Sequence, residues 1–191
     1  MAFLRSPFGA DPPPPLSDGH ALIRVPEMGD YEQWANLRLT SRDFLTPWEP
    51  IWPANDLTRS AFRSRIRHYW RDIDDDAAYP FFIFRASDET LVGAVTLSNV
   101  RRGVAQTGTL GYWIGAPHAR QGYMTSAVRL VTGFAFHQLG LHRVEAACLP
   151  HNQASIGLLQ KCGFAQEGLA RGYLRIAGEW RDHLLFARLA V

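Results

Sequence analysis

The chain has 191 residues, of which 47% are hydrophobic and 12% aromatic, so it can bury the core of one ordinary domain, and disorder of most of its length is excluded. Lysine and arginine number 20 against 18 aspartate and glutamate, which leaves a net charge of +2. This charge is too balanced for a protein that holds nucleic acid mainly by neutralising phosphates.

The sequence also lacks the signals of a membrane or secreted protein. No apolar run reaches the ~18 residues of a membrane span, and residues 1–5 have neither the basic start nor the long apolar stretch of a signal peptide. We therefore expect a cytoplasmic protein with no membrane partner. The two cysteines, Cys148 and Cys162, are too few for a disulfide framework, and no CxxC or HExxH spacing suggests a metal site. We expect both to be reduced core thiols, and we expect no metal.

The first predicted segment is an arm. Four prolines at positions 12–15 remove backbone hydrogen-bond donors and favour an extended, solvated chain. Beyond them we find no second change in composition, no linker and no internal repeat. We therefore predict a flexible proline-rich arm over residues 1–17 and a single domain over residues 18–191 that carries the function.

Within the domain, segments rich in branched and aromatic residues predict strands over residues 20–25, 80–86, 91–97, 109–115, 143–149 and 184–189. The short turn at residues 87–89 predicts a hairpin between the second and third strands. Apolar spacings of three and four predict helices over residues 57–73, 125–139 and 152–162. Asp56 or Thr58 would cap the first helix, and Gly140 would end the second in a left-handed conformation. This order indicates an α+β fold, a mixed α/β sandwich, rather than a doubly wound sheet.

The loop at residues 120–124 leads from one predicted strand directly into a helix. Such a junction directs unpaired N–H groups and the positive end of the helix dipole at one point, which suits a phosphate. Gly122 lets the backbone of the loop approach a ligand closely. The loop matches neither a Walker motif nor GxGxxG, so an ordinary tight connection is the alternative interpretation.

Further motifs follow in a distinctive order: Leu110-Gly111-Tyr112, Pro150-His151-Asn152, Gly163-Phe164, Glu167-Gly168 and Glu179-Trp180-Arg181-Asp182-His183. With the stretches at residues 43–50 and 98–102, they make most of residues 20–190 resemble the GCN5-related N-acetyltransferase (GNAT) superfamily. Within it, the chain resembles the ribosomal-protein-alanine N-acetyltransferases, which acetylate protein N-termini. The resemblance implies an acetyltransferase domain over residues 18–191, with a central mixed sheet whose central strands splay and are flanked by helices.

The resemblance also implies a site for acetyl-CoA. The strand at 109–115 would offer backbone groups to the pantetheine arm, and residues 119–124 match the family's phosphate loop. Gly122 fits that loop, whereas Ala119 and Met124 depart from it and should weaken affinity modestly. The implied cofactor-binding residues are Tyr112, Trp113, Ile114, Arg120, Gln121, Gly122, Tyr123, Met124, Thr125 and Asn152. Asn152 is also a candidate helix cap.

Transfer to an amine needs a proton acceptor, a donor to the leaving thiolate and a group that stabilises the oxyanion. Many superfamily members use a tyrosine as donor, but Leu159 occupies that position here, so Ser155 is the candidate, with a solvated helix serine as the alternative. Glu145 and Glu167 are the candidate bases. Glu145 is expected on a strand covered on both faces, and either carboxylate could instead be a salt-bridge partner of Arg143 or Arg171.

Aromatic and charged residues beyond the needs of the fold suggest an acceptor slot. Residues 172–183 predict a hairpin that turns at residues 177–178, and Tyr173, Trp180 and Asp182 on it could wall the slot. Trp48, on a proline-rich loop, could form the opposite wall together with the neighbouring aromatic residues Phe44 and Trp52. The alternatives are a plain hairpin and packing in the core.

These features together predict an N-acetyltransferase that moves the acetyl group of acetyl-CoA to the α-amino terminus of a protein, with a ribosomal protein as one candidate. The amine would attack directly in a ternary complex, without a metal and without a direct nucleic-acid partner. One alternative is acetylation of a small amine, such as an antibiotic, a polyamine or an amino acid. Another is a non-catalytic acyl-CoA-binding or ribosome-assembly module. A strongly acidic groove would favour a polyamine, and aromatic walls would favour a peptide.

Overall fold

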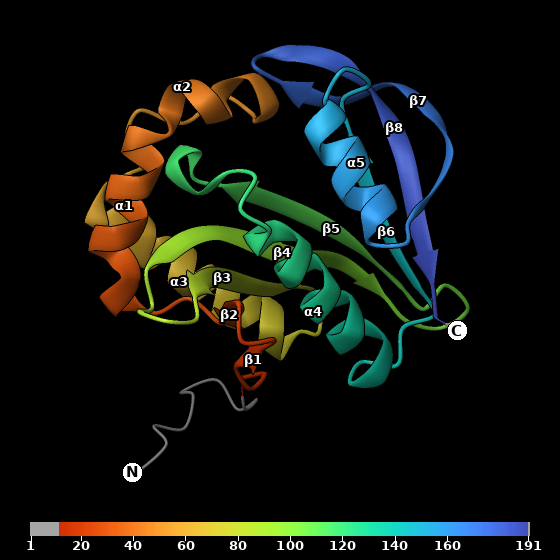
Figure 1. The fold of residues 1–191 in the computed structure, drawn as a ribbon, viewed down its shortest axis with the longest axis horizontal. Helices are drawn as coiled ribbons and strands as arrows, with labels where there is room; N and C mark the ends of the chain where they lie inside the picture. The colour runs from red at the N-terminus through yellow and green to blue at the C-terminus, as the bar shows by residue number, and fades with distance from the viewer. Residues whose placement is uncertain (1–11, 191) are drawn as a thin grey trace.

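A computed structural model describes residues 12–190 and arranges their strands in one sheet of order β1-β2-β3-β4-β5-β6-β8-β7 (Figure 1). The strands are β1 (Leu16–Ser17), β2 (Ala21–Arg24), β3 (Tyr79–Arg85), β4 (Leu91–Arg101), β5 (Thr107–Ile114), β6 (Arg143–Cys148), β7 (Ala165–Ile176) and β8 (Glu179–Leu189). The helices are α1 (Tyr31–Thr40), α2 (Arg42–Leu45), α3 (Arg59–Asp74), α4 (Tyr123–His137) and α5 (Gln153–Lys161). Neighbouring strands are antiparallel except β5 and β6, which are parallel. The predicted mixed α/β fold is confirmed.

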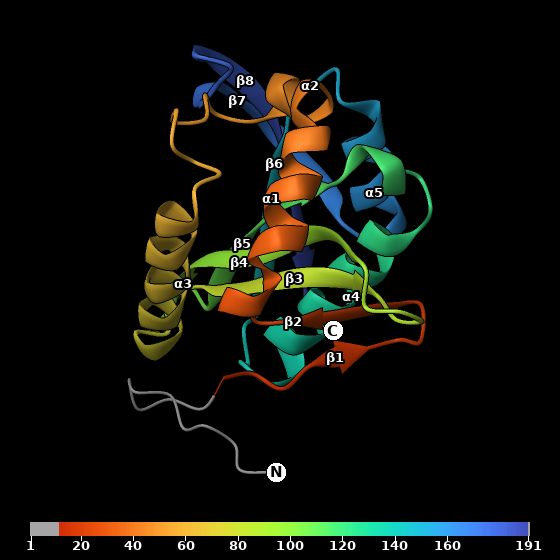
Figure 2. The same cartoon turned by 90° about the vertical axis from the view of Figure 1, so that its left-hand side faces the viewer.

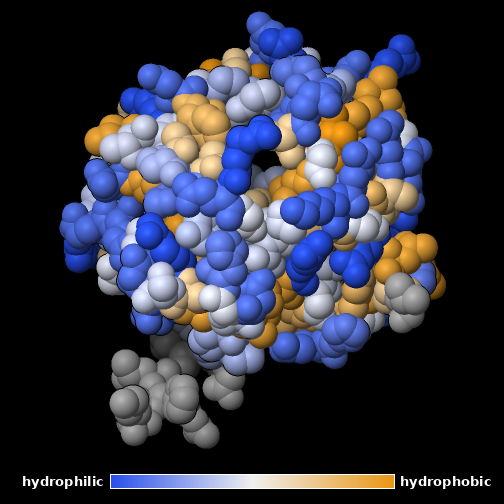
Figure 3. All heavy atoms as spheres, viewed as in Figure 1, coloured by the Kyte–Doolittle hydropathy of each residue, from blue (hydrophilic) through white to orange (hydrophobic). Residues whose placement is uncertain are grey.

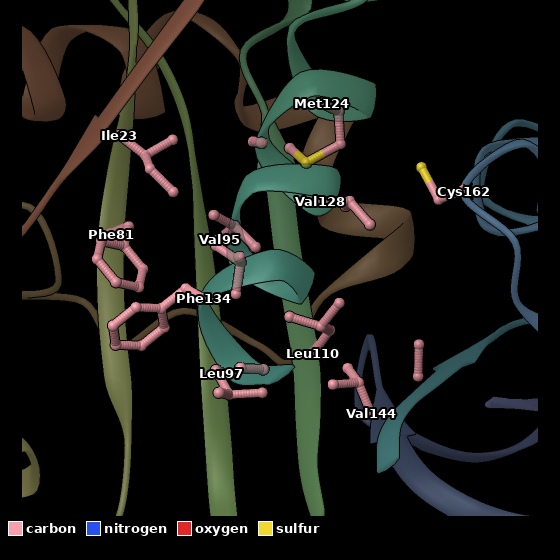
Figure 4. Close-up of a cluster of buried hydrophobic side chains, with 14 of the residues drawn as sticks. Ile23, Phe81, Val95, Leu97, Leu110, Met124, Val128, Phe134, Val144 and Cys162 are labelled. Carbon is pink, nitrogen blue, oxygen red and sulfur yellow. The ribbon is translucent and has the colours of Figure 1, made fainter. Parts of the chain in front are cut away.

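Helices cover both faces of the sheet. Figures 1 and 2 show α4 across one face and α3 on the other, and α5 lies against β6 and β7. Because successive side chains of a strand point to opposite faces, Phe81 packs in the core under α4 while Phe82 packs under α1 and α3. Figure 4 shows the core under α4, where Val128 and Phe134 meet side chains of the strands.

The six predicted strands and three predicted helices are present, with ends that differ by a few residues. Thr58, and not Asp56, caps α3: its hydroxyl accepts a hydrogen bond from the Ala61 N–H at 3.2 Å. Gly140 has a φ of +67° just after α4, as expected for a left-handed stop. The hairpin at residues 87–89 joins β3 to β4, and the turn at residues 177–178 joins β7 to β8.

Three elements at the N-terminal side were not predicted. Leu16 and Ser17, assigned to the arm, form β1 and pair with Ile23 and Leu22, so that boundary was wrong by two residues. Residues 1–11 of the predicted arm lie outside the described residues. Helix α1, followed by the short α2, was missed because its buried positions include an arginine, Arg38, which local patterning treats as an exposed residue.

The central strands β5 and β6 separate from each other along their length, as the resemblance implied. Residues 107–110 of β5 pair with residues 143–146 of β6, and beyond Leu110 strand β5 pairs with β4 alone. On its other edge, β6 pairs with β8 along its whole length. In Figure 1 the two strands meet near the C-terminus and diverge from there. Residues 111–114 of β5 therefore have one edge that is not paired with β6.

Helix α5 begins beside this splay, and Asn152 is its cap. The Asn152 Oδ1 atom accepts a hydrogen bond from the Ser155 N–H at 3.0 Å. Removing a capping oxygen leaves a helix donor without its partner, so Asn152→Ala should lower the free energy of unfolding by about 1 kcal/mol. Urea denaturation measures this loss. Asn152→Asp keeps the acceptor oxygen and should stay within about 0.5 kcal/mol of the wild type, whereas equal stability of the alanine variant would show that the cap contributes nothing.

Candidate functional site

The residues at the start of α4 form the predicted loop. Arg120 and Gly122 adopt left-handed conformations, with φ of +61° and +90°, and Gly122 is the residue at which the helix begins. The first N–H groups of an α-helix have no partner within the helix, so they are free to bind a ligand. The loop and the first turn thus place free N–H groups at the positive end of the α4 dipole, an arrangement that suits an anion.

The side chains of Tyr123 and Met124, the first two residues of α4, are buried. Tyr123 and Met124 are 7% and 9% exposed and belong to the core under α4, where Figure 4 shows Met124. Only the backbone of these two residues can face a ligand at the loop. The large Met124 side chain therefore does not fill the loop, which limits the cost of its departure from the family's pattern.

Two hydroxyl groups meet at the splay. The Tyr112 and Ser155 hydroxyls lie 2.6 Å apart and join β5 to the first turn of α5. Ser155 is 8% exposed, so the alternative of a solvated helix serine was wrong. Burial raises the pKa of Tyr112, which keeps its hydroxyl protonated. Tyr112, Asn152 and Ser155, predicted from separate motifs, are thus brought together at one point.

Figure 3 shows a hollow on this face of the molecule, between α5 and the segment that leads from β5 to α4. The side chains of Tyr112 and Ile114 pack with the core on this face, and Trp113 packs on the opposite face.

Cys148 and Cys162 are free and buried, which confirms the prediction of core thiols, and burial raises the pKa of both.

A cavity of about 440 Å³ lies on the opposite face of the sheet, between α1, α3 and the loop at residues 49–56. Residues 111–113 of β5 border it, so the same strand segment that faces Ser155 on one side faces the cavity on the other. The aromatic part of the wall comes from Trp34, Trp52, Tyr69, Phe82 and Trp113. Of the predicted acceptor-slot aromatics, Trp52 therefore lines the cavity.

An ion pair that the sequence did not suggest holds this cavity together. Both Glu49 carboxylate oxygens accept hydrogen bonds from Arg38 at 2.7 Å, and the Trp52 Nε1–H donates to Glu49 at 2.7 Å. The Glu49 carbonyl accepts from the Ala177 N–H at 2.9 Å. Glu49 thereby ties α1, its own loop and the turn of the β7–β8 hairpin. Glu49 lies in the family-like stretch at residues 43–50, but nothing in the sequence pairs it with Arg38.

The other predicted acceptor residues lie outside this cavity. Trp48 is half-buried against His151, with ring centroids 5.5 Å apart. Tyr173 and Trp180 are 45% and 68% exposed on the hairpin. Asp182 accepts a hydrogen bond from the Gly172 N–H at 2.7 Å. These four side chains could contact only a substrate that extends beyond the cavity.

The two candidate bases meet at Arg143. Glu145 accepts from the Arg143 Nε–H at 2.8 Å, and both Glu167 oxygens accept from the two terminal nitrogens of Arg143. Arg143 also holds the pKa of Glu167 below its usual value, which makes Glu167 a weaker base. The Glu145 side chain is 33% exposed, so the expectation that both faces of its strand are covered was wrong. The geometry matches the salt-bridge alternative for both carboxylates.

We expect Glu145→Gln and Glu167→Gln to keep at least a third of the wild-type kcat. Each substitution removes a charge from an exposed or half-exposed ion pair, and such pairs contribute little because solvent screens them. Steady-state kinetics at saturating acetyl donor measures this. A general base contributes about 10²–10⁴-fold, so a hundredfold loss in either variant would restore that residue as the base.

Residues 12–190 contain no group of three or more His, Cys, Asp or Glu side chains placed to hold a metal ion. In the same residues, no helix is both long enough and apolar enough to cross a membrane.

Comparison with known proteins gives consistent matches along the chain. A family model described as an acetyltransferase (GNAT) domain matches residues 20–165. The chain is 41% identical over 167 residues to the probable N-acetyltransferase YjcK of Bacillus subtilis (strain 168), covering 87% of this chain and 92% of that protein. It is 31% identical over 172 residues to the ribosomal protein uS5-alanine N-acetyltransferase of Escherichia coli (strain K12), covering 90% of this chain and 89% of that protein. The solved structure of Mycobacterium smegmatis RimJ in complex with CoA-disulfide matches with a TM-score of 0.87 and 30% identity, covering 96% of this chain and 89% of RimJ.

Proposed function

Because the chain belongs to the GNAT acetyltransferase family and is an acyltransferase, we propose that it transfers the acetyl group of acetyl-CoA to the α-amino group at the N-terminus of a protein. One observation carries the proposal. Residues 111–113 of β5 border an aromatic cavity on one face of the sheet, and on the other face Tyr112 bonds to Ser155 beside the splay. A donor and an acceptor that approach from opposite faces would meet at this segment.

The donor would occupy the face that carries α4 and α5. The backbone N–H groups of residues 120–125 would hold the diphosphate, with Arg120 adding charge. The unpaired edge of β5, at residues 112–114, and Asn152 would hold the pantetheine arm. The RimJ structure, at 30% identity, is a complex with CoA-disulfide, which supports this assignment of the cofactor.

The reaction needs two proton movements. The amine nitrogen attacks the thioester carbonyl carbon, the new C–N bond forms and the C–S bond breaks. Ser155 would protonate the leaving sulfur to give CoA with a free thiol and would regain a proton from water, while the Tyr112 hydroxyl, hydrogen-bonded to Ser155, orients it and keeps its own proton. The amine loses its own proton to water, because an α-amine has a pKa of about 7.7–8.0 and needs only a weak base. N–H groups of the splayed strand would stabilise the oxyanion.

The cavity would receive the acceptor. Its two carboxylates are each paired with an arginine at 2.7 Å, Glu49 with Arg38 and Asp56 with Arg65, so the cavity is not strongly acidic. Its walls are aromatic. Aromatic walls with neutralised carboxylates favour a peptide over a polyamine, and the Escherichia coli relative acts on a ribosomal protein alanine. The half-buried Trp48 and the exposed Tyr173, Trp180 and Asp182 would contact residues further along the peptide.

A thiol-release assay tests the proposal. The purified protein and acetyl-CoA are mixed with peptides that begin with alanine or serine, with the same peptides blocked at the N-terminus, and with spermidine and free amino acids. We expect turnover on the free N-termini alone. Turnover only on the small amines would support small-molecule acetylation instead, and CoA binding without thiol release on any acceptor would contradict the proposal.

A further inference from the structure

We propose that His20 is a positioning residue of the coenzyme A site, which orients the peptide group between Gln121 and Gly122 so that its N–H faces the diphosphate. This inference rests on the proposed function, because the loop must bind CoA. His20 lies in the turn between β1 and β2, 101 residues before Gln121 in the chain. His20 is the first residue of the first predicted strand, and it belongs to none of the motifs that point to the loop.

The imidazole ring contacts Gln121 and Tyr123 and lies beside Gly122, the residue between them. Its Nε2 atom lies 3.0 Å from the Gln121 carbonyl oxygen, and because a carbonyl can only accept, Nε2 carries the proton and donates. The ring stacks on Tyr123, with centroids 4.5 Å apart and an angle of 5° between the planes. A Cβ atom placed on Gly122 would lie 3.4 Å from Nε2. The ring is thus held flat against the loop just before α4.

The hydrogen bond to the Gln121 carbonyl determines where the next N–H points. In a trans peptide the C=O and N–H bonds point in opposite directions, so the Gly122 N–H points away from His20. No carbonyl of residues 12–190 accepts a backbone hydrogen bond from that N–H. It is therefore available to a ligand. A hydrogen bond at the carbonyl also polarises the peptide group and makes its N–H a stronger donor.

The loop needs such an anchor because of its own conformation. Gly122, which follows this peptide group, and Arg120, one residue before Gln121, are both left-handed, with φ of +90° and +61°. Glycine adopts several such conformations at similar cost, so local preferences alone do not select one orientation of the peptide group. The bond from His20 selects the orientation before the ligand arrives, which lowers the ordering cost of binding.

The turn that carries His20 does not depend on the imidazole ring. The Asp18 carboxylate accepts hydrogen bonds from the backbone N–H groups of His20 and Ala21, at 3.0 and 2.9 Å. The His20 side chain itself is exposed. Substitution of the ring should therefore leave the fold intact and act on the loop alone.

Two substitutions separate the hydrogen bond from the stacking. His20→Phe keeps a flat ring that can stack on Tyr123 but has no N–H, and His20→Gln keeps an N–H donor but has no ring. His137→Phe, at an exposed position near the other end of α4, is the matched control. Loss of one hydrogen bond predicts a Kd for CoA about three to tenfold higher in His20→Phe, with kcat unchanged. His20→Gln and the control should bind CoA within about twofold of the wild type.

A truncated acetyl donor distinguishes positioning from a general structural role. S-acetylpantetheine lacks the diphosphate, so its kcat/KM should be equal in the wild type and all three variants, whereas kcat/KM for acetyl-CoA should fall in His20→Phe. Equal CoA affinity of His20→Phe and wild type would overturn the inference, as would a matching loss with S-acetylpantetheine. Failure of the wild type to bind CoA would instead overturn the proposed function, and this inference with it.

Discussion

Gly122→Asp is expected to weaken CoA binding more than a hundredfold, measured by calorimetry. The new carboxylate would stand at the residue where α4 begins, beside the position proposed for the diphosphate. Two like charges 4 Å apart repel by about 4 kcal/mol near a protein surface, and each 1.4 kcal/mol is a factor of ten in affinity. The side chain would also approach His20, whose Nε2 lies 3.4 Å from the position of a Cβ on Gly122.

Gly122→Asn is the control for this prediction. Asparagine has nearly the same size as aspartate and tolerates the left-handed conformation about as well, so it introduces the same strain without the charge. We expect it to lose at most about tenfold in affinity, with a thermal stability equal to that of the aspartate variant. If Gly122→Asp binds CoA as tightly as the wild type, the diphosphate does not lie at this loop.

Ser155→Ala is expected to lower kcat by about 10²–10³-fold, because the leaving thiolate would lose its proton donor. The Kd for CoA should change less than about threefold, since the hydroxyl acts on the sulfur as it leaves and not on the bound ground state. The cap of α5 is unaffected, because Asn152 accepts from the backbone N–H of Ser155. Equal kcat in wild type and variant would remove Ser155 from the proposed mechanism.

The substitution also leaves the buried Tyr112 hydroxyl without its partner, which costs about 1–3 kcal/mol of stability. The double variant Ser155→Ala/Tyr112→Phe removes both hydroxyls and should recover most of that stability. Its kcat should remain as low as that of Ser155→Ala. A double variant that recovered activity together with stability would show that the serine acts only on the fold.

Much of the fold could be predicted because its signals are local. The hairpin turn at residues 177–178 needs left-handed residues, and Ala177 and Gly178 have φ of +48° and +87°. The capping oxygen of Asn152 and the glycine before α4 are likewise recognised from neighbouring residues alone. The loop at residues 120–124 and Ser155, the proposed donor, could therefore be predicted from the sequence.

The pairing of charged residues was not predicted. Arg38 is buried only because Glu49, from a loop outside its helix, neutralises it, and that contact encloses the cavity. Glu145 and Glu167 were equally plausible as bases or as salt-bridge partners until β6 and β7 placed both beside Arg143. A carboxylate has the same local sequence pattern in either role.

By itself, the sequence determined which segments are strands and helices, where the left-handed glycine precedes α4, and which family the chain resembles. The strands, the helices and the glycine depend on backbone preferences and apolar periodicity, which act over a few neighbouring residues, and the resemblance depends on short motifs in a distinctive order. The tertiary structure decided that one segment of β5 faces Ser155 on one side and an aromatic cavity on the other, and that His20 contacts the loop. Such contacts join residues up to a hundred positions apart, and only the packing of the whole chain brings them together.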